Sequence, residues 1–303
     1  MPVKAIVLSG SGLLFPAHLG FLQAVNQQDW FSNITCISGT SGGAFSSFLW
    51  LLCHQLDNSG KAFNDACDDI LTHGTEEMLS KVDIGLLITR FGMMSFEPFE
   101  SHFVDILRIY GKCDGKNGRP MPYMTFQELF DYCGKTLVIV ASDPKNNTAK
   151  YFSHLTTPDV KVLNAVRFSM TVTGIFAMEN NKSIDPFFKS KYHPFEWRYV
   201  DGALCDTFPM NYVAEIMKID ESEILGNFIH TTVDFDGKSI LSLFKSQLSW
   251  IFSSRILPNK PNTIVVPFQP HENMFSRFTT QQRIDLLNRA KDYTLGKIKE
   301  LNV

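Results

Sequence analysis

The sequence lacks the features of a membrane-spanning, secreted or nucleic-acid-binding protein. No apolar run approaches the roughly 18–20 residues that cross a bilayer. Residues 1–9 contain only a short apolar run, without the basic segment and long apolar stretch of a secretory signal, so we expect no signal peptide. The net charge is −3 over 303 residues, whereas nucleic-acid binding calls for a basic surface. We expect no nucleic-acid partner, and membrane contact that is peripheral and transient.

The cysteines also lack the spacing of a metal or redox site. None of the six forms a C-x-x-C pair, and none clusters with histidine at zinc-ligand spacing, so we expect no metal site. Cysteines scattered among apolar positions are typical of buried, reduced thiols, which indicates a reducing compartment such as the cytoplasm. A chain of this length buries a core large enough to fold without such cross-links.

Strand and helix patterns alternate from the start of the chain. This alternation predicts an α/β fold with a central, mostly parallel sheet flanked by helices, in a single domain over residues 1–303. Residues 57–135 hold no clear strand and are expected to form a helical insertion. Asp159 is expected to cap the helix that follows it. The expected strands span 4–8, 34–38, 136–141, 151–153, 197–200, 223–229 and 263–267; the expected helices outside the insertion span 15–28, 44–56, 160–170, 239–252 and 280–301.

A short small-residue turn joins the expected strand 34–38 to the expected helix 44–56. Its sequence, Gly39-Thr40-Ser41-Gly42-Gly43, matches the G-x-S-x-G pattern of a nucleophile elbow. Such a turn is so sharp that a β-carbon at Gly39 or Gly43 would collide with the neighbouring strand or helix. It raises the serine oxygen over a helix N-terminus, where free N–H groups favour an anion. The same pattern also fits an ordinary turn rich in glycine and serine.

A second small-residue loop, Ser9-Gly10-Ser11-Gly12, follows the first expected strand. It is not a P-loop, because no Gly-Lys-Ser/Thr follows, and Phe15 stands where a dinucleotide-binding loop has its third glycine. A small loop with consecutive N–H groups is able instead to form an oxyanion hole, which stabilises the negative oxygen of a tetrahedral intermediate. The alternative is a plain turn between strand and helix.

An ester-cleaving serine needs a base to take its proton. His230 and His271 both follow expected strands, so either would complete a triad with Ser41. Asp201 ends the expected strand 197–200 and, if that strand is parallel, lies on the same edge of the sheet as the elbow. It would take the proton directly, although Asp201-Gly202 also fits a turn. In triad hydrolases of the α/β type the nucleophile follows several strands, whereas Ser41 follows the second.

In order and spacing, four segments of the chain resemble the patatin-like phospholipases. The resemblance implies a parallel-sheet α/β fold and a Ser41–Asp201 dyad that hydrolyses acyl esters of phospholipids or other lipids without a metal or other cofactor. It also implies an oxyanion hole from the backbone of Gly10, Ser11 and Gly12. The matching segments are residues 7–22 (glycine-rich loop and first helix), 37–44 (nucleophile elbow), 165–176 (a helix and turn) and 199–209 (the segment of the catalytic aspartate).

The chain departs from the family's pattern at four positions. Ser11 replaces the middle glycine of the loop, Leu14 and Phe15 replace a basic residue and a glycine, and Thr173 replaces a proline. A loop altered in this way predicts low activity or a need for a protein activator. The alternative is a relative without catalytic activity that binds lipid or a protein partner.

Two apolar segments are candidates for a membrane-facing cap over the site. They are residues 84–99, with two adjacent methionines, and 239–255, an expected amphipathic helix. The 26 phenylalanines of the chain would likewise either fill the core or line a pocket for an acyl chain. In both cases the common alternative is packing in the core.

Overall fold

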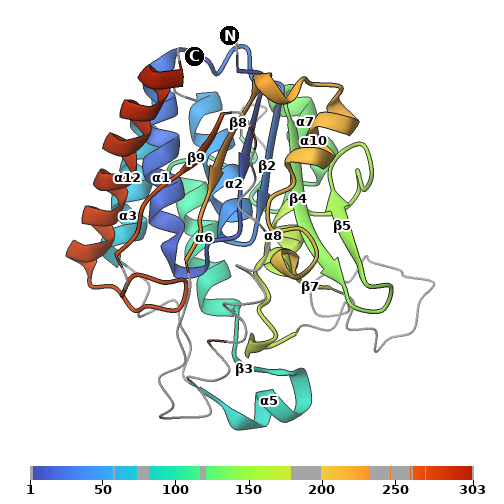
Figure 1. Ribbon diagram of the computed structural model, residues 1–303. Coiled ribbons are helices and arrows are strands. Elements are labelled where there is room, and N and C mark those ends of the chain that lie inside the picture. The colour runs from blue at the N-terminus through green and yellow to red at the C-terminus, as the bar shows by residue number, and fades with distance from the viewer. Residues whose placement is uncertain are drawn as a thin grey trace.

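The computed structural model describes residues 3–56, 59–73, 82–116, 121–178, 199–231, 246, 260, 262–269 and 271–301 (Figure 1). A central sheet of seven strands runs through the molecule in the order β5-β4-β2-β1-β8-β9, and β7 pairs with β4 beside β2. Its strands are β1 (Ala5–Leu8), β2 (Cys36–Thr40), β4 (Thr136–Asp143), β5 (Thr148–Phe152), β7 (Val200–Asp201), β8 (Ile224–Phe228) and β9 (Thr263–Val265).

The sheet is parallel except at one side. β1, β2, β4, β8 and β9 run parallel to one another, whereas β5 and β7 both run antiparallel to β4. β1 and β2 are buried along their whole length, as expected of parallel strands covered on both faces. The mostly parallel sheet flanked by helices confirms the fold class predicted from the alternating pattern.

Helices cover both faces of the sheet. On one face α10 packs in a small cluster with residues of β1, β2, β4 and β8, and on the other lie the helices that form the larger core. In that core α1 packs closely on α12, and Gly20 of α1 leaves no space for a β-carbon beside the backbone of α12. The helices are α1 (Phe15–Val25), α2 (Gly42–Leu56), α3 (Lys61–His73), α5 (Ile84–Arg90), α6 (Glu97–Ile109), α7 (Phe126–Cys133), α8 (Val162–Met170), α10 (Met210–Met217) and α12 (Thr280–Leu301), with short 3-10 turns η1 (Gly12–Leu14), η2 (Asn26–Gln28), η3 (Gly202–Leu204) and η4 (Glu221–Glu223).

The described residues of the segment 57–135 are mainly helical, but the prediction that this segment holds no clear strand is wrong. β3 (Gly92–Met94) lies within it and pairs in parallel with β6 (Gly174–Phe176), about 80 residues further along the chain. Three residues carry too short a pattern to be recognised as a strand. This small second sheet joins α5 to the segment that follows α8.

Two further expectations about helices have different outcomes. Asp159 does not cap α8: the N-cap is Lys161, and the helix begins at Val162. The expected helix 239–252 lies outside the described residues, apart from a single position at 246. Among the helices of the described part, none is long and apolar enough to cross a bilayer.

Candidate active site

The elbow around Ser41 has the backbone strain of a nucleophile turn. Ser41 follows β2 directly and has φ 53°, a left-handed backbone conformation that residues other than glycine rarely adopt. A β-carbon at Gly39 would lie 2.3 Å from the carbonyl oxygen of Gly43, and one at Gly43 would lie 2.5 Å from the carbonyl oxygen of Ser9. Both glycines therefore allow β2, α2 and the end of β1 to approach closely.

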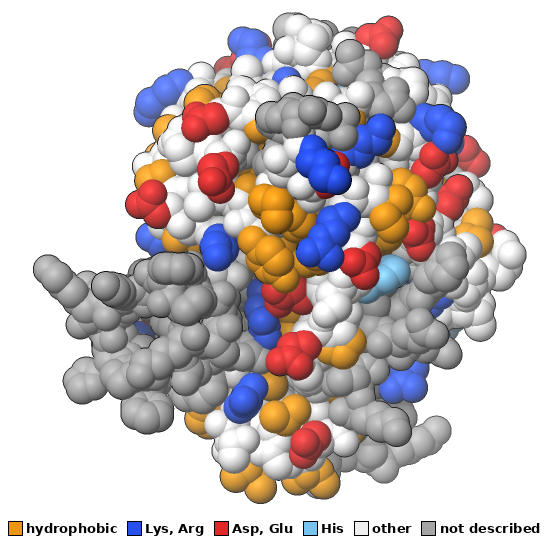
Figure 2. Space-filling view, turned by 180° about the vertical axis from the view of Figure 1, so that it is seen from behind, with side chains coloured by type: hydrophobic (Ala, Val, Ile, Leu, Met, Phe, Trp, Pro, Cys, Tyr) orange, Lys and Arg blue, Asp and Glu red, His pale blue; other side chains and the backbone are white. Residues whose placement is uncertain are grey.

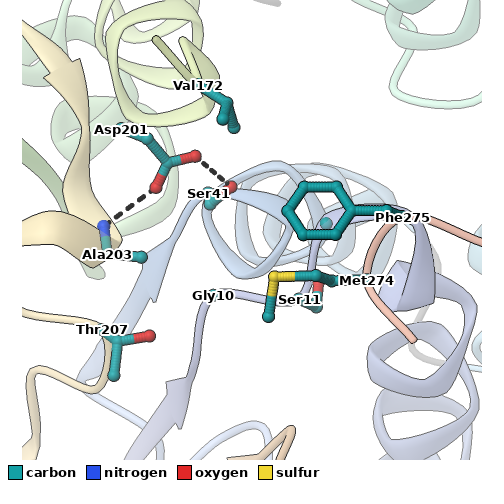
Figure 3. Close-up of a pocket in the computed structure, with 10 residues that line it drawn as sticks. Gly10, Ser11, Ser41, Val172, Asp201, Ala203, Thr207, Met274 and Phe275 are labelled. Carbon is teal, nitrogen blue, oxygen red and sulfur yellow. Dashed lines mark hydrogen bonds between the residues drawn. The ribbon is translucent and has the colours of Figure 1, made fainter. Parts of the chain in front are cut away.

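The pairing of β4 brings Asp201 to Ser41. Thr40, the last residue of β2, pairs with Val140, and the next residue of β4, Ala141, pairs with Asp201 of β7. β4 therefore pairs with β2 up to Val140 and, on the same side, with β7 from Ala141 onward. The Ser41 hydroxyl donates to Asp201 Oδ2 over 2.7 Å, and Asp201 Oδ1 accepts from the Ala203 N–H over 2.9 Å (Figure 3).

The strand that carries Asp201 runs in the opposite direction to the predicted one. The prediction placed Asp201 at the end of a parallel strand, but β7 is antiparallel to β4. Trp197 and Arg198, which were expected to begin that strand, lie outside the described residues, and β7 consists of Val200–Asp201. Strand direction follows from the path of the chain and not from the apolar pattern of the strand, so the local sequence could not supply it.

Burial changes the acidity of Asp201. The residue is 1% exposed, and its removal from water raises the pKa of the carboxyl from 3.8 to about 7. Hydrogen bonds from the Ala203 N–H and the Ser41 hydroxyl act in the opposite direction but are outweighed. A carboxylate with a pKa near 7 is matched to accepting and returning a proton at neutral pH.

We expect ester hydrolysis to depend on the deprotonated form of Asp201. Because burial holds its pKa at about 7, kcat/KM should fall about tenfold per pH unit below pH 7 and level off above it. The measurement is a pH profile of kcat/KM with a soluble ester, with a separate check that the protein stays folded at each pH. A profile flat from pH 5 to pH 8 would contradict a proton-accepting role for Asp201.

The glycine-rich loop is held from three sides. The Ser9 carbonyl accepts from His18 Nε2 over 2.8 Å, so the proton of this buried imidazole sits on Nε2. The Ile229 N–H donates to the Ser9 hydroxyl, and the Leu13 N–H donates to the Met274 carbonyl. Burial lowers the pKa of His18 to about 4, which keeps the ring neutral at the pH of a cell. The loop is therefore preorganised.

Not all three predicted oxyanion donors are available. The Gly10 N–H donates to the Thr207 carbonyl over 2.9 Å. Within the described part of the chain the N–H groups of Ser11 and Gly12 have no hydrogen-bond partner, and both residues line the same pocket as Ser41. The structure thus leaves two of the three predicted donors free to bind a negative oxygen.

A pocket opens over the paired side chains (Figure 3). The predicted residues Gly10, Ser11, Gly12, Ser41 and Asp201 all line it. Sequence analysis did not single out the other five: three lie in the segments 165–176 and 199–209 that carry the resemblance, and two lie in a later segment without a motif. They are Val172, Ala203, Thr207, Met274 and Phe275.

A family model described as patatin-like phospholipase matches residues 6–214. The chain belongs to this family. It is 26% identical over 270 residues to triacylglycerol lipase 4 of Saccharomyces cerevisiae, a match covering 84% of this chain and 27% of the lipase. It is 23% identical over 278 residues to triacylglycerol lipase 5 of the same yeast, covering 82% of this chain and 34% of the lipase. The chain thus spans about a third or less of either yeast lipase.

The fold also matches a solved structure. VipD from Legionella pneumophila superposes with a TM-score of 0.54 at 18% identity, over 99% of this chain and 67% of VipD. At this identity the match shows a shared fold.

Two departures from the patatin-like pattern belong to the core. Leu14 is fully buried, and Phe15 is 6% exposed with its ring against that of Phe45. The usual basic residue at position 14 would have to be buried here among apolar side chains, which is costly for a charge. In this chain packing, and not a charged side chain, supports the start of α1.

A third departure, Ser11, fits a space left by the elbow. A β-carbon at Gly42 would lie 2.2 Å from Ser11 Oγ, so the Ser11 hydroxyl occupies the volume that a side chain at position 42 would need. This hydroxyl is buried and has no hydrogen-bond partner in the described part of the chain. Ser11 and Gly42 are therefore complementary in size.

Ser169 is a further residue of the site that the sequence did not single out. Its hydroxyl accepts from the Ser41 N–H over 2.7 Å and donates to the Val140 carbonyl, so it ties the strained elbow to β4 and α8. Ser169 lies within the segment 165–176 that carried the family resemblance, and that segment was the available signal.

The histidines proposed for a triad do not join the pocket. No histidine of the described residues lines it. His230 is half-buried after β8, with its ring near that of Phe228, and His271 is exposed. The hydrogen bond of the Ser41 hydroxyl goes to Asp201.

Proposed function

We propose that this protein hydrolyses fatty-acyl esters of phospholipids or related lipids, with Ser41 as nucleophile and Asp201 as base. The observation that carries the proposal is the 2.7 Å hydrogen bond from Ser41 Oγ to Asp201 Oδ2 in a pocket that also holds the free N–H groups of Ser11 and Gly12. A nucleophile, a base within hydrogen-bond reach and oxyanion donors together favour acyl transfer. Membership of the patatin-like family supports a lipid substrate.

The proposed reaction has two halves. Asp201 takes the Ser41 proton as Oγ attacks the ester carbonyl carbon, and the N–H groups of Ser11 and Gly12 bind the resulting oxyanion. The intermediate collapses, the C–O bond to the lipid alcohol breaks, and Asp201 returns the proton to the departing alcohol. Water then attacks the acyl-serine, giving its proton to Asp201, and the second collapse releases the fatty acid and returns that proton to Ser41. Every proton passes through Asp201, so these steps call for no cofactor.

The proposal extends to where the protein works. Cys36, Cys53, Cys67 and Cys113 are buried thiols whose pKa is raised by burial, and this suits a reducing compartment such as the cytoplasm. The protein would then reach a lipid substrate from the cytoplasmic side of a membrane.

The test measures fatty-acid release together with labelling of Ser41. The purified chain is incubated with phosphatidylcholine vesicles and, separately, with emulsified triacylglycerol, and released fatty acid is quantified. In parallel, a fluorophosphonate probe is added and the modified peptide is mapped by mass spectrometry. We expect release from at least one lipid and modification of Ser41. If the protein neither releases fatty acid nor takes up the probe, the proposal is overturned in favour of a relative that only binds lipid or a protein.

A further inference from the structure

Helix α5 presents an apolar surface to solvent. We call this the α5 surface: Val82 is 63% exposed, Ile84 68%, Leu87 38%, Ile88 76% and Phe91 49%. Five large apolar side chains within ten residues are unusual on the outside of a globular protein, where such residues occur singly. In Figure 2 hydrophobic side chains show at the bottom of the molecule, the end at which Figure 1 places α5.

The core does not hold α5 in place. None of its seven residues is buried. Polar contacts hold both ends of the helix instead: Asp83 Oδ1 accepts from the Gly85 N–H over 2.7 Å at the start, and the Met178 N–H donates to the Arg90 carbonyl over 2.8 Å at the end. The apolar side chains of Ile84, Leu87 and Ile88 therefore remain exposed in the described part of the chain.

The connections of α5 lead to the active site. The Gly174 N–H donates to the Phe91 carbonyl, and β3 pairs with β6, which begins two residues after the pocket residue Val172. Apolar rings continue the connection inward: Phe176 of β6 packs against Phe96, 5.4 Å between centroids. In Figure 1 both α5 and β3 lie beyond the end of the sheet toward which the parallel strands run.

We propose that the α5 surface inserts into the surface of a phospholipid bilayer and so turns the Ser41 pocket toward its substrate. The role of this orientation in catalysis rests on the proposed function, whereas membrane binding itself does not require catalysis. An exposed helix with apolar side chains is suited to this role, since helices that lie in a membrane surface bury an apolar face about 5–10 Å into the boundary between headgroups and acyl chains. No residue of α5 is acidic, and its only charge, Arg90, is at the last position.

The size of the α5 surface favours a bilayer over a protein partner. Stable protein–protein interfaces bury about 800 Å² on each partner and use about 20–30 residues. A seven-residue helix is only about 10 Å long, and with Val82 and Phe91 beside it the α5 surface offers five side chains to contact. Shallow insertion into lipid needs no larger complementary surface, because hydrocarbon surrounds each side chain that enters.

The test compares two double variants with the same change in charge. Ile84→Asp/Ile88→Asp alters the α5 surface, and Ile109→Asp/Ile216→Asp alters two exposed isoleucines on α6 and α10. Each protein is sedimented with sucrose-loaded phosphatidylcholine vesicles. We expect the bound fraction of the α5 variant to give a partition coefficient at least about tenfold below wild type, with the control unchanged. Hydrolysis of a water-soluble short-chain ester should be equal in all three proteins.

Several outcomes would overturn the proposal. They are a wild type that does not sediment with vesicles, an α5 variant that binds as wild type does, and a control that loses binding equally. As a second measurement, Ile88→Trp should show tryptophan quenching by vesicles of brominated lipid beyond that of wild type, and equal quenching would also contradict insertion. If wild type binds vesicles but releases no fatty acid and takes up no probe, the proposed function fails while the inserting surface stands.

Discussion

Replacing Asp201 by asparagine should lower ester hydrolysis roughly 10³-fold while making the protein more stable. Asparagine keeps the shape of the side chain and a hydrogen-bond partner for both the Ser41 hydroxyl and the Ala203 N–H, but it does not accept a proton. General base catalysis contributes about 10²–10⁴-fold to such reactions. The measurement is kcat/KM on a soluble ester and on phospholipid vesicles.

The gain in stability follows from the buried charge. Asp201 has a pKa of about 7 in the folded protein against 3.8 as the ordinary value, so the stability due to its neutral form is complete below pH 3.8 and is lost as the pH rises through 7. The difference corresponds to about 4 kcal/mol of unfolding free energy above pH 7. The asparagine side chain carries no such charge, and the variant should therefore exceed wild type in urea unfolding at pH 8, and by much less at pH 5.

The matched control for this substitution is an exposed aspartate. Asp105 of α6 has a side chain that is 63% exposed, and Asp105→Asn should leave hydrolysis and urea unfolding close to those of wild type. Ser41→Ala should lower hydrolysis at least as much as Asp201→Asn does, and the double variant should be no worse than Ser41→Ala, because the two side chains act as one unit. If Asp201→Asn retains hydrolysis, Asp201 is not the base, and a histidine becomes the candidate.

Replacing Gly39 by alanine should distort the turn at Ser41 and destabilise the protein. The added methyl carbon would meet the Gly43 carbonyl oxygen at 2.3 Å and the Ala44 nitrogen at 2.6 Å, and both belong to the backbone at the start of α2. Neither atom moves aside without shifting the helix. Overpacking against flexible side chains costs about 1–3 kcal/mol, so a clash with backbone should reduce the free energy of unfolding by more than about 3 kcal/mol. Hydrolysis should be lost with it.

The control for Gly39 is a glycine with open space around it. A β-carbon at Gly296, inside α12, would meet nothing within 4 Å. Gly296→Ala should therefore raise stability by about 0.5–1 kcal/mol, the ordinary gain of alanine over glycine within a helix. Urea unfolding and ester hydrolysis are measured on both variants. A Gly39→Ala protein with near-normal stability and activity would contradict the close approach of β2 and α2.

Local features of this protein were readable from its sequence. Spaced glycines at 39 and 43 predict the sharp turn at Ser41, because the steric need for them lies within a few residues of the chain. Alternating strand and helix patterns predicted the α/β class for the same reason. The three-residue β3 escaped prediction because its pairing with β6 depends on contacts about 80 residues away.

The sequence by itself determined the elbow, the glycine-rich loop and the alternation of strands and helices that sets the fold class, since each follows from backbone sterics and apolar periodicity over short distances. Only the tertiary structure decided that β7 is antiparallel, that the Gly10 N–H is taken by Thr207, and that Ser169 supports Ser41. It also decided that the apolar residues of α5 face solvent. These features depend on which distant segments meet when the chain packs, and neither periodicity nor a motif records that.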